Sequence, residues 1–166
     1  MKGIDDEVLV ASMSIPGAHD AATGEGMYSP SGLGITQELT LQELWDCGVR
    51  AFDLRPAVKD TLLFIFHGPL RTMVSFREAL DILCKRLKTY PSEFAIVLLR
   101  EETDSENEGE RALWPSLVRK TISSLGDRAA VFSPGMRVAD ARGKILFLTR
   151  IIGRCFTQQS TLVRGE

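Results

Sequence analysis

Apolar residues along the chain gather in short runs, separated by polar, glycine-rich or helical segments. Five of these runs have the length of a β-strand, and they lie at 8–15, 49–54, 62–66, 94–99 and 144–149. The first run closes at Pro16-Gly17, a pair typical of a tight turn. The second and third runs are apolar enough to be buried on both faces of a sheet.

Three segments between these runs predict helices. Thr40 and Glu43 have the spacing of a capping box, which indicates a short helix ending at 47–48. From 75 to 88 apolar residues recur at helical spacing while basic residues occupy the other face. A further helix is expected over 113–125.

Apolar strands that alternate with helices predict an α/β fold of parallel β/α units, with helices covering the sheet. The chain supplies about five strands, whereas a closed β/α barrel needs eight strands and typically about 250 residues. Two architectures remain open, a small open α/β sheet and a barrel truncated before it closes. Residues 151–166 show neither period and are expected to form an irregular tail.

Two long polar segments interrupt this pattern. The segment 21–36 is rich in glycine, serine and small residues and predicts a long loop, which in a compact domain is often functional. The segment 101–110 is strongly acidic and predicts a solvated loop. Trp45, Trp114 and Cys84 fall within helical patterns, where we expect core positions.

Composition excludes several classes of protein. The net charge of −2 over 166 residues argues against a broad nucleic-acid surface. The three cysteines are far apart and fit neither a zinc site nor a disulfide framework. No run approaches the ~20 apolar residues of a transmembrane segment, and the acidic N-terminus shows no signal peptide. The compartment therefore stays open, extracellular or cytoplasmic.

Polar residues suited to catalysis stand at the carboxyl ends of the predicted strands. In parallel α/β folds that edge is where ligands bind. They are His19, Asp53, Arg55, His67, Arg100 and Arg150.

Two histidines with several arginines suit phosphodiester transfer. Near neutral pH one imidazole can accept a proton while another donates one. Arginine stays charged, and its planar set of donors matches phosphate oxygens. Taken singly, each of these residues could equally be structural; their joint placement favours catalysis.

Five motifs, in this order and spacing, resemble those of the phosphatidylinositol-specific phospholipase C catalytic X region. They are SIPGAHD at 14–20, GVRAFDLR at 48–55, FHG at 66–68, YPSE at 90–93 and RGKILFLTR at 142–150. The resemblance covers 8–150 and implies the N-terminal half of a distorted β/α barrel with its site at the C-terminal rim.

The resemblance also implies roles for individual residues. His19 would be the general base that deprotonates the inositol 2-hydroxyl, and His67 the general acid that protonates the departing diacylglycerol oxygen. Asp20 would orient His67. Arg55 would stabilise charge on the phosphoryl oxygens, and Asp53 would organise the polar network around them.

The same comparison implies that neither metal nor cofactor is needed. In the calcium-dependent branch of the family, the positions of Asp20, Arg55 and the end of the fourth strand carry calcium ligands. Here a guanidinium stands at one of these positions and Arg100 aligns with another, although a shift of one residue would place Glu101 there. The pattern resembles the metal-independent, bacterial-type branch, in which Arg100 and Arg150 align with positions that contact inositol hydroxyls.

The implied enzyme cleaves phosphatidylinositol-type lipids at a membrane surface to diacylglycerol and a cyclic inositol phosphate. The family's partner carboxylate for His19 and an aromatic residue that stacks on inositol belong to the second barrel half, so no orienting carboxylate for His19 is evident. A catalytically silent lipid- or phosphate-binding fragment is the alternative. A metal-dependent glycerophosphodiester-type enzyme, whose metal is held by carboxylates, ranks last. Open strand edges predict self-association of a half-barrel.

Overall fold

The structure is a computed structural model that describes residues 1–28, 32–102 and 108–149. Its main feature is a sheet in which every neighbouring pair of strands is parallel. The strand order is β1 (Gly17–Ala18), β2 (Ala51–Leu54), β6 (Ala95–Leu99), β8 (Ile145–Thr149) and β7 (Ala129–Val131). The predicted α/β class with about five parallel strands is therefore confirmed.

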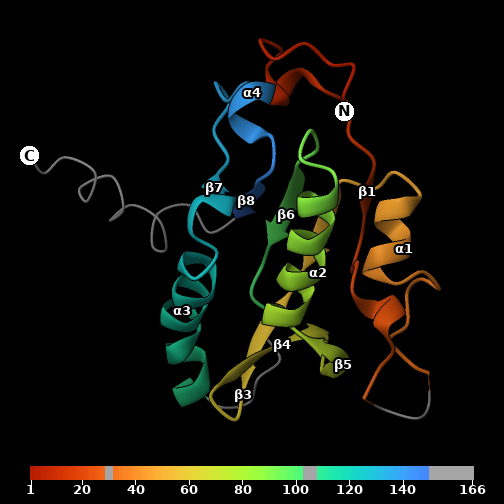
Figure 1. The fold of residues 1–166 in the computed structure, drawn as a ribbon. Coiled ribbons are helices and arrows are strands. Elements are labelled where there is room, and N and C mark those ends of the chain that lie inside the picture. The colour runs from red at the N-terminus through yellow and green to blue at the C-terminus, as the bar shows by residue number, and fades with distance from the viewer. Residues whose placement is uncertain (29–31, 103–107, 150–166) are drawn as a thin grey trace, which may run out of the picture.

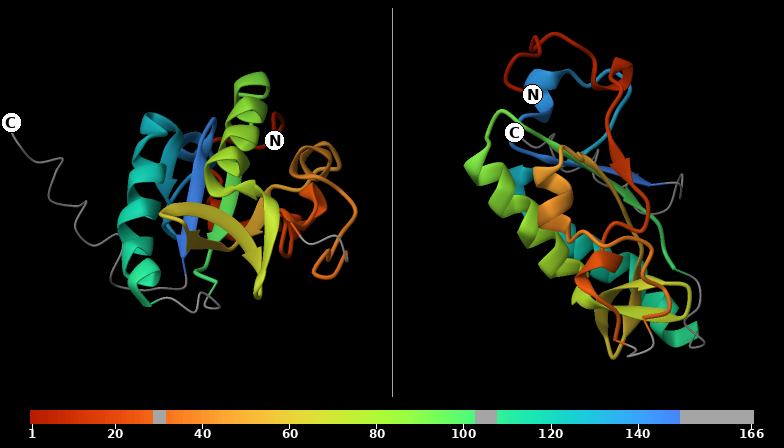
Figure 2. Two further views of the ribbon diagram at one scale, coloured as in Figure 1. Left: turned by 90° about the horizontal axis from the view of Figure 1, so that it is seen from below. Right: turned by 90° about the vertical axis from the view of Figure 1, so that its right-hand side faces the viewer.

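Three helices cover one face of this sheet, as Figures 1 and 2 show. They are α1 (Leu41–Asp46), α2 (Phe76–Thr89) and α3 (Glu108–Ser123). The larger hydrophobic core lies between these helices and the sheet, because alternate strand residues such as Phe52, Leu54 and Phe147 point toward the helices. Trp45, Trp114 and Cys84 are buried in this core, as predicted.

A second, smaller core lies against the other face of the sheet. It joins the N-terminal segment, with its 3₁₀ turn η1 (Val10–Ser12), to helix α4 (Val138–Ala141) and to Phe94 and Leu146. The predicted strand at 8–15 is therefore wrong. Its apolar residues pack under the sheet, and pairing begins only after Pro16, whose carbonyl accepts hydrogen bonds from the start of β2.

A three-stranded antiparallel sheet packs beside the parallel one. It is formed by β3 (Pro56–Lys59), β4 (Leu62–His67) and β5 (Leu70–Ser75). The prediction of a doubly buried parallel strand at 62–66 is wrong, because β4 belongs to this meander and Leu62 is exposed. The fifth parallel strand is instead the short β7, which follows the 3₁₀ turn η3 (Gly126–Arg128).

In the described part of the chain, every helix is too short or too polar to cross a lipid bilayer. The domain limits 8–150 and the self-association of the half-barrel remain predictions. The predicted irregular tail at 151–166 lies outside the described residues.

The start of α2 gives a test of the local structure. Ser75 and Glu78 form a reciprocal capping box: the serine hydroxyl accepts from the Glu78 N–H, and the glutamate accepts from the Ser75 N–H and hydroxyl. Ser75→Ala should lower the free energy of unfolding by about 1 kcal/mol, measured by urea titration. Ser116→Ala should have little effect, because its exposed hydroxyl bonds only to the Leu113 carbonyl within α3.

The penalty for Ser75→Ala should also depend on pH. Hydrogen bonds from the backbone and side chain of Ser75 lower the pKa of Glu78 below its ordinary value of 4.5. A lowered pKa means that this stabilisation is present above pH 4.5 and is lost as pH falls through the lowered value. The measured penalty should therefore shrink in acid, and an equal penalty at pH 7 and at about pH 3 would contradict the assignment.

Candidate active site

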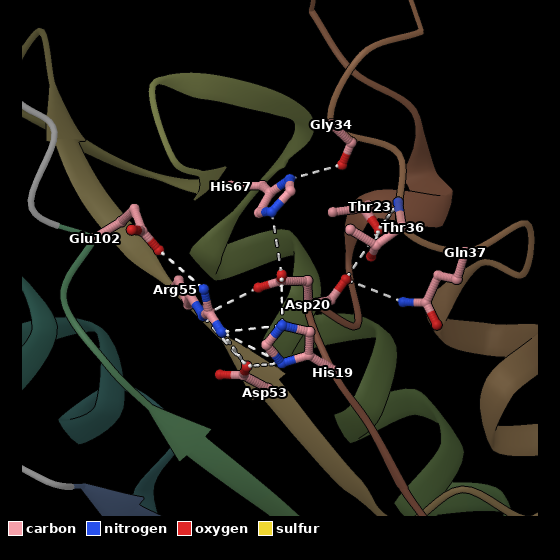
Figure 3. Close-up of polar contacts among 10 residues, drawn as sticks. All are labelled: His19, Asp20, Thr23, Gly34, Thr36, Gln37, Asp53, Arg55, His67 and Glu102. Carbon is pink, nitrogen blue, oxygen red and sulfur yellow. Dashed lines mark hydrogen bonds and ion pairs between the residues drawn. The ribbon is translucent and has the colours of Figure 1, made fainter.

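Three segments bring the predicted polar residues together at the carboxyl ends of β1 and β2 (Figure 3). His19 and Asp20 directly follow β1, and Asp53 and Arg55 lie at the end of β2. The short strand β1 is fixed in register by parallel pairing with β2, and the Ala21 N–H donates to the Asp53 carbonyl. The two strand ends are therefore tied by backbone bonds immediately beside the site.

His67 arrives from the small antiparallel sheet rather than from the parallel one. It is the last residue of β4, whose Phe66 N–H donates to the Arg55 carbonyl at 2.9 Å. The meander begins directly after Arg55, so a short hairpin returns the chain to the same rim. The predicted neighbourhood of His67 and the other site residues is correct, although the predicted route to it was not.

The carboxylate of Asp20 lies at the centre of the site, with a side chain only 1% exposed. Its Oδ2 is 3.1 Å from Nε2 of His19 and 3.5 Å from Nε2 of His67. Its Oδ1 is 3.0 Å from Nε of Arg55. Because both imidazoles contact one oxygen atom, their Nε2 atoms are no farther apart than the sum of these two short distances.

His19 is placed between two carboxylates, while its side chain remains 70% exposed. Its Nδ1 is 3.0 Å from Oδ2 of Asp53, and its Nε2 faces Asp20. Nη2 of Arg55 lies 3.3 Å and 3.4 Å from its two ring nitrogens. The expectation that His19 has no orienting carboxylate is wrong, because this chain itself places two carboxylates beside the ring.

Arg55 is surrounded by three carboxylates and is 12% exposed. Its Nη2 donates to Asp53 at 2.9 Å, its Nε contacts Asp20, and its Nη1 is 3.5 Å from Oε2 of Glu102. Burial alone would lower the pKa of Arg55. The hydrogen bond to Asp53 and the charges of Asp53, Asp20 and Glu102 outweigh it and raise the pKa above its ordinary value.

Glu102 is the residue that the sequence analysis missed. It belongs to the acidic segment predicted to be solvated, yet it is 6% exposed and faces Arg55. Its Oε2 has no hydrogen-bond partner among the described residues, so the ion pair with Arg55 is its main compensation. Its position shortly after the buried strand β6, on the same rim as the other site residues, was the available signal.

Of the two predicted substrate-binding arginines, the structure describes Arg100. Arg100 is exposed, follows β6 and lines a cavity of ≈ 620 Å³ that also borders His19, Asp53 and Arg55. Arg150 lies outside the described residues. The apolar wall of this cavity includes Leu98 and Leu148, which point away from the helix-covered core.

Three of the site residues carry groups that can ligate a metal ion. Ligand atoms of His19, Asp20 and Asp53 lie within 4.8 Å of one another, the one such group in the described parts of the chain. A divalent cation would need several carboxylate oxygens. Those oxygens already face the guanidinium of Arg55 at 2.9 Å and 3.0 Å. The described residues therefore fit a fixed cationic side chain better than an ion.

No family model matches the chain. It is 29% identical over 153 residues to a 1-phosphatidylinositol phosphodiesterase of Listeria monocytogenes, which covers 90% of this chain and 47% of that protein. The chain thus spans about half the length of this relative.

Solved structures of similar proteins cover a similar share of this chain. A phosphatidylinositol-specific phospholipase C from Listeria monocytogenes superimposes with a TM-score of 0.72 at 28% identity, over 90% of this chain and 55% of that one. One from S. aureus gives 0.74 at 19% identity, over 90% and 51%. A calcium-dependent enzyme from a Pseudomonas species gives 0.58 at 13%, over 87% and 60%. The last two likenesses show the fold alone, and they support the prediction of part of a barrel.

Proposed function

We propose that this chain, which resembles the phosphatidylinositol-specific phospholipases C in sequence and in fold, carries the acid–base centre of a phosphodiesterase acting on phosphatidylinositol-type lipids without a metal ion. The supporting observation is the shared contact of His19 and His67 with one buried carboxylate beside Arg55. Two imidazoles at that separation can reach the attacking and leaving oxygens of one phosphodiester.

The first step is attack by the inositol 2-hydroxyl. A neutral imidazole carries one N–H, so His19 can donate to only one of its two carboxylates. The other nitrogen then holds a lone pair and accepts the hydroxyl proton. The freed oxygen forms a bond to phosphorus, and the negative charges of Asp20 and Asp53 beside the ring stabilise the resulting imidazolium.

The second event is departure of the glyceryl oxygen. As its bond to phosphorus breaks, His67 donates a proton from Nε2, so that diacylglycerol leaves as a neutral alcohol. The products are diacylglycerol and a cyclic inositol phosphodiester. The proton taken up by His19 balances the one that His67 gives, and the two histidines exchange protonation states.

Arg55 supplies the positive charge for the phosphoryl oxygens. Its guanidinium is held by Asp20, Asp53 and Glu102 in a partly buried position, so little reorganisation is needed when charge develops. Asp53 binds both Arg55 and His19, which fits its predicted role as organiser of the network. Arg100, on the cavity wall, is proposed to bind the inositol ring, and Arg150 keeps the same predicted role.

A phospholipid surface is the proposed partner. Exposed apolar residues lie on the loop after β1 and on β5, and the Gly34 carbonyl, between Leu33 and Ile35, contacts His67. They are Tyr28, Leu33, Ile35 and Met73. Leu33 and Ile35, which flank Gly34, would bury apolar area at a lipid interface while the headgroup enters the cavity.

One observation favours a second function. The chain spans about half the length of the relatives it matches. The alternative is a silent fragment that binds lipid headgroups or phosphate through Arg55 and Arg100 without turnover.

Phosphorus NMR of phosphatidylinositol vesicles treated with the protein in excess chelator distinguishes these functions. We expect the lipid signal to be replaced by that of a cyclic inositol phosphate at the same rate with and without chelator. Loss of cleavage on chelation would contradict a metal-independent reaction. Binding of inositol phosphate by calorimetry with no cleavage would support the silent fragment.

A further inference from the structure

We infer that Thr23 and Thr36 are positioning residues for His67. The hydrogen bonds between these two threonines, here called the clasp, join two parts of the loop after β1. The clasp thereby holds the Gly34 carbonyl on Nδ1 of His67, so that the transferable proton is on Nε2. The loop includes the 3₁₀ turn η2 (Thr23–Glu25). This inference deepens the proposed role of His67 as general acid and rests on it.

The first observation is the contact between the ring and the loop. Nδ1 of His67 is 2.9 Å from the Gly34 carbonyl oxygen. A carbonyl oxygen only accepts hydrogen bonds, so Nδ1 must carry a proton. In water the neutral histidine side chain prefers its proton on Nε2. The Gly34 carbonyl therefore selects the tautomer that water disfavours.

The second observation is what holds the carbonyl there (Figure 3). The buried Thr23 hydroxyl donates to the Asp20 carbonyl at 3.0 Å. Its single proton is then used, so in the 2.7 Å contact with the Thr36 hydroxyl it is the acceptor. The Thr36 N–H donates to the same oxygen at 3.2 Å, and Gln37 adds a bond to the Asp20 carbonyl.

These bonds connect the two groups that face the nitrogens of His67. The backbone of Asp20 anchors the clasp, while its side chain faces Nε2 of the histidine. At the other end of the hydroxyl pair is Thr36. Gly34 lies two residues before it in the chain, and its carbonyl oxygen faces Nδ1 of His67. Both ring nitrogens are thus positioned by one hydrogen-bonded unit that the Thr23–Thr36 contact holds together.

Packing against the hairpin fixes the position of Gly34 as well. Its φ of +91° favours glycine. A Cβ added there would lie 2.9 Å from Cδ1 of Leu70 and 3.1 Å from Cε of Met27. A side chain at this position would have to displace the ends of these two side chains and adopt a strained backbone conformation, so both effects favour glycine here.

The chemical consequence concerns the leaving group. With Nδ1–H bound to Gly34, the charged ring can release only the Nε2 proton, and the neutral ring that remains keeps its favourable bond. If the clasp opens, the ring is free to turn, and protonation of the glyceryl oxygen becomes less efficient. Attack by the 2-hydroxyl does not involve this ring and is unaffected.

The first test needs no activity. The chain has two histidines, so long-range ¹H–¹⁵N spectra show two rings, and His19→Gln assigns them. Well above the ordinary imidazole pKa of about 6.5, His67 should show the Nδ1–H tautomer. Thr36→Val should shift it toward Nε2–H, and Thr36→Ser should restore it. Thr121→Val, which removes a hydroxyl bonded within α3, should leave it unchanged.

The second test uses two substrates. For Thr36→Val we expect kcat to fall about 10-fold with a diacylglycerol leaving group and less than 2-fold with a nitrophenyl leaving group, which needs no general acid. Gly34→Ala should show the same selectivity. An Nε2–H tautomer in the wild-type protein, or equal losses on both substrates, would overturn the inference. A protein without activity but with the expected tautomer shift would contradict the proposed function and leave the clasp intact.

Discussion

Replacing His19 by alanine should slow cleavage of phosphatidylinositol by about 10²- to 10⁴-fold, the usual contribution of a positioned general base. The loss should be nearly the same with a diacylglycerol and with a nitrophenyl leaving group. The reason is that the base acts on the attacking hydroxyl, whichever group departs. Initial rates on both substrates at several concentrations give the change in kcat/KM.

His67→Ala is the matched comparison, because its loss should be much larger with diacylglycerol than with nitrophenyl. The rate loss expected for His19→Ala should not come from a loss of folded protein. The His19 side chain is 70% exposed, so its removal leaves no cavity in the core, and a urea titration of His19→Ala checks that the fold is intact. A His19→Ala protein that cleaves either substrate at the wild-type rate would leave the imidazole without a role as base.

Helices were predictable here because their signals are local. Thr40 with Glu43 and Ser75 with Glu78 satisfy the first N–H groups of α1 and α2 within four residues of sequence. The apolar run at 62–66 carried no such information. Its hydrophobicity fits a buried parallel strand and one strand of a meander equally well, and partner strands alone distinguish them.

The turns around β4 carry only a weak sequence signal for the hairpin. Asp60 and Thr61 both have positive φ, 51° and 63°, and join β3 to β4 in a tight two-residue hairpin. Gly68, with φ of 56°, lies in the next connection. Asp-Thr is a weak sequence mark for such a turn, since asparagine and glycine are the usual residues. The short β7 has too few residues to show any period.

The site was predictable where chemistry follows strand ends, and unpredictable where it depends on contacts across loops. His19, Asp53 and Arg55 are placed by strand geometry alone. Glu102 was hidden in a run of like charges, and its burial follows from the ion pair with Arg55. The Gly34 carbonyl has no sequence signature at all, because a backbone oxygen is selected by folding and not by residue type.

Arg55→Ala should reduce kcat/KM by about 10²- to 10³-fold, equivalent to roughly 3 kcal/mol of transition-state stabilisation. Arg55→Lys should recover little of this loss. The three carboxylates lie around all three nitrogens of the guanidinium, with Asp53 accepting from both Nε and Nη2, and a single ammonium group cannot reach all of them. Arg77→Lys, at a surface pair with Asp81, is the matched control and should keep full activity.

The same variant should reveal the electrostatic cost of the site. Without the guanidinium, Asp20, Asp53 and Glu102 are left close together with no arginine between them. Arg55→Ala should therefore be less stable than wild type at pH 7. The difference should narrow in acid, because protonation removes the carboxylate charges that repel one another.

The sign of the Arg55 shift completes this prediction. A raised pKa means that the charge, and the stability it contributes, is fully present below the ordinary arginine value and is lost only at higher pH. Arg55 therefore stays charged throughout any practical assay, and a fall in activity at moderately alkaline pH must come from another group.

Calcium added to Arg55→Ala tests whether the guanidinium is more than a counter-charge. If the guanidinium serves only as a counter-charge for three carboxylates, the ion should restore both stability, measured as a rise in Tm, and activity. If the guanidinium acts on the phosphoryl group through its directed donors, stability should return without activity.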